Sequence, residues 1–171
     1  MDRLFFLVRL FSKMNERVGR SVSWVMLPML FVMLYEVFTR YVISAPTEWG
    51  TETSSFLFAA YTLLGAGYAL LYGDHVIVNV LYNRFPTRKK ALVDLITSVF
   101  FFLYCGVLIK GGTIYLLESI QMGRTSGTDW NPPLWPALIA LPVGTLLMLL
   151  QGVAKFIKDL NIVYTGKEPQ A

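Results

Sequence analysis

Long apolar runs alternate with short polar segments along this chain. The apolar runs cover residues 19–43, 50–72, 91–117 and 134–157. Each is long enough to cross a bilayer as a helix, which needs about 20 apolar residues at about 1.5 Å rise per residue. The pattern predicts an all-α integral membrane protein with four transmembrane helices, in a single membrane domain that covers residues 1–171.

The segment before the first run has a different periodicity, with charged and apolar positions on opposite sides of a helix. The charged face and the apolar face consist, respectively, of Arg9, Lys13, Glu16 and Arg20, and of Leu4, Leu7, Phe11, Met14 and Val18. This pattern predicts that residues 1–18 form an amphipathic helix in the headgroup plane of the membrane. In the first apolar run, Pro28 removes a backbone donor and predicts a bend near the start of the helix.

Basic residues are distributed unevenly among the segments outside the apolar runs. The N-terminal segment carries five, the segment after residue 72 carries four and the C-terminal end carries three, whereas the other two connections carry only Arg40 and Arg124. Since Lys and Arg are retained on the cytoplasmic side, we expect both termini to be cytoplasmic. Four acids are then expected near the opposite surface, namely Glu48, Glu52, Glu118 and Asp129. The net charge of +4 is thus a sign of membrane orientation and not of nucleic acid binding.

Composition limits the chemistry that the chain can carry. Hydrophobic residues make up 55% of the chain and charged residues 15%, a balance that a water-soluble domain of this size could not bury. Cys105 is the single cysteine and His75 the single histidine, which excludes a disulfide within the chain and a paired-histidine haem or zinc site. The sequence also contains no nucleophile and base constellation and no phosphate-binding glycine loop. We therefore expect no cofactor, no metal and no enzymatic activity.

Ionisable residues fall inside the apolar runs, among them Glu36, Arg40 and Lys110. Glu36 and Arg40 are separated by one helical turn with the acid first, so we expect them to form an intrahelical ion pair. A proton-carrying role for Glu36 is the alternative, because an ionisable group inside a bilayer is costly and usually functional. Lys110 interrupts the third run and is expected either to extend toward the membrane surface or to meet an acid on a neighbouring helix.

Small residues recur one helical turn apart in the second and fourth runs. These pairs are Ser55 with Ala59, Gly65 with Ala69, and Ala140 with Gly144. Such pairs allow two membrane helices to approach closely. They predict that the second and fourth helices each present a face for close helix packing.

Several short motifs occur in an order and spacing that resemble one known family. They are Arg40-Tyr41, Trp49-x-x-Glu52, Leu64-Gly65-Ala66 with Tyr68, Gly73-Asp74-His75-Val76 and Arg84-Phe85-Pro86. Segments 131–136 and 141–144 also resemble a branch of that family. With its length and four-helix layout, the chain resembles the DctQ-type small membrane subunit of tripartite ATP-independent periplasmic (TRAP) transporters. The chain departs from the family at Thr51 and Asn79, where an acid is frequent, and near Ser55, where a basic residue is frequent, so charge pairs at those positions are not carried over.

The resemblance implies a division of labour among three proteins. In such systems a periplasmic binding protein captures an organic acid, a large membrane subunit moves it inward with sodium, and the small subunit braces the large one. The partners implied for this chain are therefore a large TRAP membrane subunit, a periplasmic substrate-binding protein and membrane lipid. The implied location is the bacterial inner membrane.

The same resemblance, together with the small-residue faces, assigns residues to two kinds of contact. The expected structural and large-subunit interface consists of Arg40, Trp49, Glu52, Gly65, Ala69, Gly73, Asp74, His75, Ala140 and Gly144. The expected binding-protein contacts are Glu48, Arg124 and Asp129.

Two other classes of protein have a similar layout. A self-contained four-helix proton-coupled exporter would use Glu36 as its proton site, although such chains are shorter and lack the basic N-terminal helix. A membrane anchor of a redox enzyme would bind haem, which a single histidine disfavours. The chain offers no broken helix pair with converging polar groups of the kind that binds substrate at the midplane, so bracing is the preferred interpretation.

Overall fold

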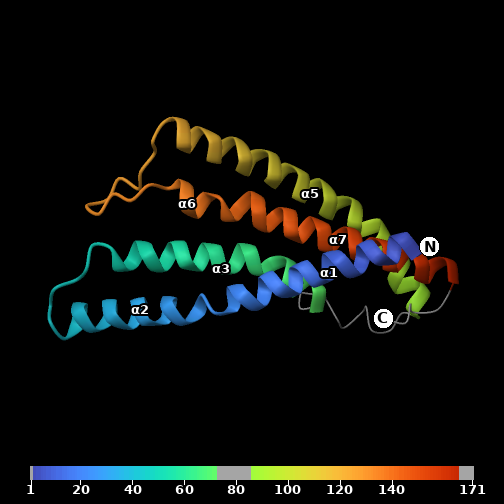
Figure 1. Ribbon diagram of the computed structural model, residues 1–171, viewed down its shortest axis with the longest axis horizontal. Coiled ribbons are helices and arrows are strands. Elements are labelled where there is room, and N and C mark those ends of the chain that lie inside the picture. The colour runs from blue at the N-terminus through green and yellow to red at the C-terminus, as the bar shows by residue number, and fades with distance from the viewer. Residues whose placement is uncertain (1, 73–85, 166–171) are drawn as a thin grey trace.

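The computed structural model describes residues 2–72 and 86–165, and the described residues are helical apart from short connections (Figure 1). The helices are α1 (Asp2–Ser23), α2 (Met26–Tyr41), α3 (Gly50–Tyr72), α5 (Thr87–Gln121), α6 (Trp135–Leu138) and α7 (Ala140–Thr165). Four stretches are long and apolar enough to span a membrane, namely Phe6–Tyr41, Gly50–Tyr72, Arg88–Gln121 and Trp135–Thr165. The predicted all-α class with four spanning helices is confirmed. The predicted residues Gly73, Asp74 and His75 lie outside the described ranges.

The first spanning stretch is a long helix that is interrupted between α1 and α2. The interruption lies at Trp24 and Val25, so α1 continues beyond the predicted boundary at residue 18. Pro28 has no amide to donate to the Trp24 carbonyl, and that carbonyl accepts instead from the Leu27 amide at 3.2 Å. The predicted bend near Pro28 is therefore present, and it turns α1 across the neighbouring helices (Figure 1).

The long helices α2, α3, α7 and α5 lie side by side in that order, and α1 crosses α3 and α7 (Figure 1). α2 packs mainly against α3, and α5 packs mainly against α7. This order leaves α2 and α5 at the two edges, each with large apolar side chains facing outward. Phe31 on α2 is 70% exposed and Phe100 on α5 is 73% exposed. The edges are therefore covered by lipid or by another protein.

The contact between α3 and α7 is a close approach of two backbones. Gly144 is buried, and a Cβ at this position would overlap the carbonyl oxygen of Leu63. Ala140, one turn earlier, is only 4% exposed. Ala140 and Gly144 were expected to face a large subunit, but both are enclosed within this chain. Their small size serves the packing of α7 against its own neighbours, and we assign them to internal packing.

The contact between α5 and α7 combines small residues, rings and one ion pair. Gly152 of α7 is buried where a Cβ would overlap the ring of Phe101. The rings of Phe102 and Phe156 meet edge to face with centroids 5.8 Å apart. In the second half of α7, Lys155 Nζ lies 2.8 Å from an Asp94 carboxylate oxygen. No periodic pattern in the sequence predicts this ion pair, because its two residues lie on different helices.

The α1 helix is held by a buried amide. The Asn15 side chain is 1% exposed and donates from Nδ2 to the Leu147 carbonyl at 3.2 Å and to Gln151 Oε1 at 3.4 Å, both on α7. Its Oδ1 occupies the space that a Cβ on Gly67 of α3 would fill. A second glycine contact places the Tyr68 ring of α3 against Gly19. Asn15 thus joins α1 to both central helices.

The α3–α7 contact generates a first prediction. Gly144→Leu should lower the free energy of unfolding by about 3 kcal/mol or more, because the added side chain has no space against the α3 backbone. Gly111→Leu is the matched control, since a Cβ there meets nothing within 4 Å. Thermal unfolding of both variants in detergent measures the difference. Equal stability of the two variants would contradict the close approach.

The Asn15 contact generates a second prediction. Asn15→Ala removes the donor to α7 and leaves the buried Gln151 amide without its partner, which should cost about 1–3 kcal/mol. Amide hydrogen exchange should become faster throughout α1, while exchange in α5 stays unchanged. Asn161→Ala, in the less buried last part of α7, is the control. Unchanged exchange in α1 would show that the amide does not hold this helix.

Candidate functional site

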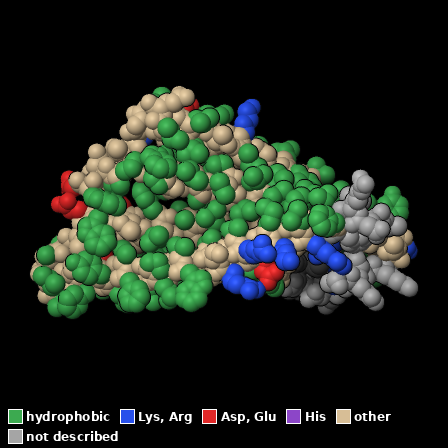
Figure 2. All heavy atoms as spheres, in the orientation of Figure 1, with side chains coloured by type: hydrophobic (Ala, Val, Ile, Leu, Met, Phe, Trp, Pro, Cys, Tyr) green, Lys and Arg blue, Asp and Glu red, His purple; other side chains and the backbone are tan. Residues whose placement is uncertain are grey.

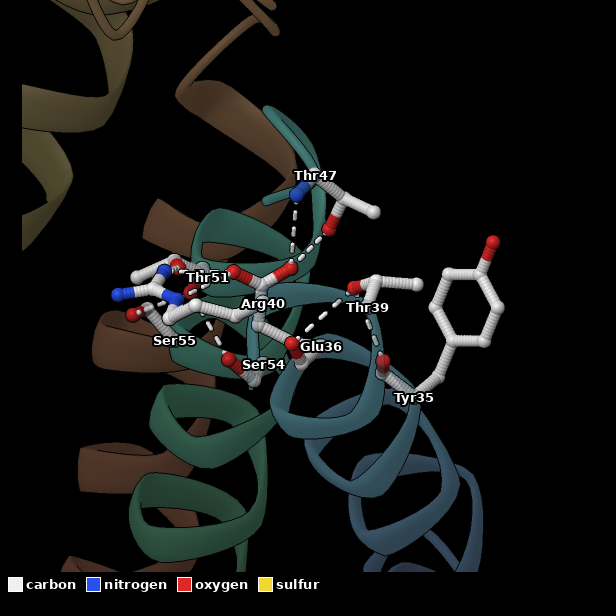
Figure 3. Close-up of polar contacts among 8 residues, drawn as sticks. All are labelled: Tyr35, Glu36, Thr39, Arg40, Thr47, Thr51, Ser54 and Ser55. Carbon is white, nitrogen blue, oxygen red and sulfur yellow. Dashed lines mark hydrogen bonds and ion pairs between the residues drawn. The ribbon is translucent and has the colours of Figure 1, made fainter. Parts of the chain in front are cut away.

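The end of the molecule where α2 meets α3 carries a closed group of polar side chains (Figure 3). The Arg40 guanidinium donates to Glu36 Oε1 from Nε at 3.1 Å and from a terminal nitrogen at 2.5 Å. The same guanidinium lies 3.5 Å from the Thr51 hydroxyl of α3. Glu36 is 7% exposed and Arg40 covers one side of it. The predicted intrahelical pair is therefore present, and it is built against α3.

The second oxygen of the Glu36 carboxylate binds the connection between the two helices. Glu36 Oε2 accepts from the Thr47 amide at 3.2 Å and from the Thr47 hydroxyl. Gly50 permits this contact, because a Cβ there would lie 2.6 Å from Glu36 Oε2 and 2.5 Å from the Thr47 hydroxyl oxygen. The carboxylate thus ties the end of α2, the connection and the start of α3 together. Both of its oxygens are occupied by donors of this chain.

The tryptophan and the acids at the start of α3 surround this group. The Trp49 ring stacks on Tyr35 of α2 with centroids 5.7 Å apart. Glu48 is exposed, and Glu52 is half-buried with one carboxylate oxygen that has no hydrogen-bond partner among the described residues. Arg40 contacts Glu36 and Thr51 rather than either of these acids. The predicted residues Arg40, Trp49 and Glu52 therefore lie together at one end of the α2–α3 pair.

The connection between α5 and α6 is an ordered loop at the same end of the molecule (Figure 1). The Ser126 amide donates to the Pro132 carbonyl at 3.0 Å, and the Leu134 amide donates to the Arg124 carbonyl at 3.1 Å. Asn131 adopts a left-handed φ of 50°, and its side chain accepts from the Gly127 amide at 3.0 Å. These bonds hold the loop in a narrow hairpin.

The predicted binding-protein contacts on this loop differ in exposure. Arg124 is partly engaged, because its guanidinium lies 3.6 Å from the Glu118 carboxylate and 5.4 Å from the centre of the Tyr115 ring. Asp129 is exposed near the tip of the loop, beside the exposed Trp130. The loop and Glu48 thus present two acids and one partly paired cation at one end of the molecule.

The predicted small-residue site on α3 remains open. Gly65 is partly exposed, and a Cβ there would meet nothing within 4 Å. Ala69, one turn further, is also partly exposed. Gly65 thus makes no close helix contact among the described residues, in contrast to Gly67 and Gly144.

The opposite end of the molecule carries the basic residues of α1. Lys and Arg side chains gather over α1 with an acid among them (Figure 2). A surface hollow of about 570 Å³ is lined there by Lys13, Glu16, Arg17, Arg20, Ser21 and Trp24. Arg20 donates to Glu16 at 2.7 Å. Cations beside an indole suit the headgroup region of a membrane.

Sequence periodicity missed the residue that holds α1. The charged and large apolar positions of α1 gave two faces, but the buried stripe is a third one that contains Val8, Asn15, Gly19 and Val22. Leu7 and Met14, on the expected apolar face of the amphipathic helix, are 39% and 40% exposed. An asparagine one turn from a glycine on the border between the two expected faces was the available signal.

The described residues offer little for direct chemistry. They contain no group of three His, Cys, Asp or Glu side chains that could hold a metal ion. Among the acids, Glu36 forms an ion pair with Arg40, and Asp94 forms an ion pair with Lys155. The arrangement is suited to holding helices together and to contacting other molecules.

Comparison with known proteins gives consistent relatives. Residues 29–161 match the family described as "Tripartite ATP-independent periplasmic transporters, DctQ component". The chain is 30% identical to the C4-dicarboxylate TRAP transporter small permease protein DctQ of Rhodobacter capsulatus over 100 residues, which are 58% of this chain and 44% of that protein. It is 25% identical to the sialic acid TRAP transporter small permease protein SiaQ of Vibrio cholerae over 149 residues, which are 81% of this chain and 78% of that protein.

A longer relative contains a segment that is similar to this chain. The chain is 22% identical to the sialic acid TRAP transporter permease protein SiaT of Haemophilus influenzae over 163 residues, which are 91% of this chain and 24% of that protein. The proteins in this comparison are components of transporters and not enzymes. Together with the four helices that are long enough to span a membrane, these matches show that the chain is a multi-pass membrane protein that belongs to the DctQ family of TRAP transporter small permease components.

Proposed function

We propose that this chain is the small subunit of a sodium-driven, binding-protein-dependent TRAP transporter that imports an organic acid. In this proposal it braces a large transport subunit and carries no cargo itself. Relatives named for C4-dicarboxylate and for sialic acid, both carboxylic acids, support this substrate class. The preference for bracing over transport comes from the geometry of the helices.

One observation carries the partnership with a large subunit. Nearly the whole chain, 91% of it, aligns with a part that makes up only 24% of the SiaT permease. A sequence of this kind therefore occurs within a permease polypeptide about four times as long. When the same segment is a separate chain, the remaining part of the permease is its natural partner.

The interior of the molecule supports a bracing role. Substrate and ion sites of secondary transporters are typically formed by discontinuous helices near the middle of the membrane. Here α3 and α5 are continuous helices, the interruptions of the other two spanning stretches lie at Trp24–Val25 and at Ile139, and glycine contacts fill the space between α3 and α7. Both oxygens of Glu36 are bound by Arg40 and Thr47, which supports a structural role for this acid.

The exposed charges on Glu48 and on the loop between α5 and α6 support a contact with a soluble partner. Glu48 and Asp129 are exposed, and Arg124 is partly exposed, at the end that the basic residues place away from the cytoplasm. An ordered, charged loop can be matched by complementary charges on a binding protein, which increases the rate of encounter. The basic face of α1 would lie among the headgroups of the cytoplasmic leaflet of the bacterial inner membrane, with both termini cytoplasmic.

The proposed function predicts which combination of proteins transports. Purification of the tagged chain from its own host in mild detergent should yield a much larger multi-span membrane protein in near-equal amount. Vesicles that contain both proteins, with the binding protein and a sodium gradient, should take up a C4-dicarboxylate or sialic acid. Vesicles with this chain alone should not. Uptake by this chain alone would contradict a bracing role, and purification without any large membrane protein would contradict the partnership.

The Glu36 site predicts a loss of stability without a loss of transport. Glu36→Gln removes the charge that binds Arg40 and should lower the thermal midpoint of the purified chain by a few degrees. Glu118→Gln is the control, because Glu118 is 45% exposed and lies 3.6 Å from its cation. Uptake per assembled complex should be the same for both variants. A proton-coupled exporter would instead lose all transport with Glu36→Gln, and that result would favour the exporter.

A further inference from the structure

Lys110 is a cation inside the apolar length of α5. It belongs to α5, between large apolar residues that face outward, such as Leu103 and Val107, which are 64% and 62% exposed. Lys110 itself is exposed. Its ammonium has three donors and is strongly hydrated in water. An exposed ammonium on an apolar helix edge is costly if lipid tails surround it.

The position of Lys110 along α5 places it inside the apolar part of the helix, nearer to the end that carries Glu118. At about 1.5 Å per residue, Lys110 is about 12 Å from Glu118 and about 24 Å from Asp94 along the helix axis. These two acids lie near the ends of the apolar part of α5, and the hydrocarbon core between the surfaces is about 30 Å thick. The ammonium therefore lies at a depth where an ionisable group normally faces protein or water.

This chain provides no partner for the ammonium within its described residues. No hydrogen bond or ion pair joins Lys110 to another described residue. Glu36, the acid inside α2, is already bound by Arg40 and Thr47. An acid that pairs with Lys110 would therefore come from outside the described residues.

The surface around Lys110 permits a close approach by another helix. Gly106, one turn before Lys110, is exposed, and a Cβ there would meet nothing within 4 Å. Thr113, about one turn after, is exposed and donates its hydroxyl to the Ile109 carbonyl at 2.7 Å, so it presents a compact side chain. A neighbouring backbone can come near α5 at Gly106 and place a carboxylate beside the ammonium.

The opposite edge of the molecule differs from α5 in charge. Along the outward side of α2 the exposed residues are apolar, including Leu30, Phe31 and Leu34. The ionisable residues of α2, Glu36 and Arg40, are bound to each other and to the start of α3. The α2 edge is thus suited to lipid, whereas the α5 edge carries a charge that lipid tails cannot satisfy.

We propose that the α5 edge around Gly106, Lys110 and Thr113 is the surface that docks a membrane helix of the large subunit, and that this helix carries an Asp or Glu that pairs with Lys110. This inference rests on the proposed function, because it requires a large membrane partner. A second copy of this chain fits poorly, since a symmetric contact would bring two Lys110 side chains together. Charge complementarity therefore favours a different protein with a carboxylate at the same depth.

Photo-crosslinking tests where the large subunit sits. A benzophenone amino acid at position 110 or 106 of the tagged chain, expressed together with its large subunit, should crosslink to that subunit on illumination. The same group at Phe31 on the α2 edge is the control and should not crosslink to it. Crosslinks from Phe31 with none from positions 106 and 110 would overturn the proposal. Crosslinks from position 110 to a second copy of this chain would overturn it as well.

Substitution of Lys110 tests the charge. Lys110→Glu and Lys110→Met should each reduce the yield of the purified complex at least about tenfold, because the partner carboxylate is left buried without a cation. Lys110→Arg keeps the charge and should retain most of the complex. An Asp or Glu to Lys change in the large subunit should restore the complex of the Lys110→Glu variant. A full yield with Lys110→Met would show that the ammonium only extends to lipid headgroups, and the proposal would be wrong.

These outcomes separate the inference from the proposed function. If the unmodified chain brings no large subunit with it, the proposed function is wrong. If the unmodified chain brings the large subunit and the Lys110 variants do so equally well, only the docking surface is wrong. The thermal unfolding of each isolated variant should match that of the unmodified chain, because Lys110 has no partner among the described residues.

Discussion

The contact on which the arrangement depends is the approach of the α3 and α7 backbones at Gly144 and Leu63. Inside a bilayer, lipid tails are as apolar as leucine side chains, so burial of apolar surface gives little drive for helices to associate. Close packing and hydrogen bonds must provide it. Gly144 brings the two backbones into contact, and the other helices are then placed relative to this central pair.

Each of the outer helices is joined to the central pair by a different device. A buried amide joins α1 to both central helices, through Leu147 and Gln151 on α7 and through the space left by Gly67 on α3. A charged hydrogen-bond group joins the end of α2 to the start of α3. Rings and an ion pair join α5 to α7. Most polar groups in these contacts are bound to one another, as buried polar groups in a membrane protein usually are, whereas Asn15 Oδ1 has no hydrogen-bond partner among the described residues.

The sequence predicted the spans because hydropathy is a property of one helix, whereas the contacts are properties of two. The spacing of Ala140 and Gly144 correctly indicated a close approach, but it contained no information on whether the neighbour was in this chain. Asn15 was not identified because a periodicity based on large apolar and charged residues ignores the face that carries small and amide side chains. The pairing of Glu36 with Arg40 was predictable because it is local, whereas the Thr47 and Gly50 contacts required the turn geometry.

A row of helices with two apolar edges has a consequence for assembly. A closed four-helix bundle would bury one face of each helix and present a uniform surface to lipid, but α2 and α5 each have one main neighbour, so both edges remain available. Two equal edges would give no orientation to a partner. The edges of this molecule are unequal, because only α5 carries a cation in the interior of its apolar length. A charge costs more in lipid than beside a carboxylate in a protein contact, so Lys110 favours association through α5 and leaves α2 to the lipid.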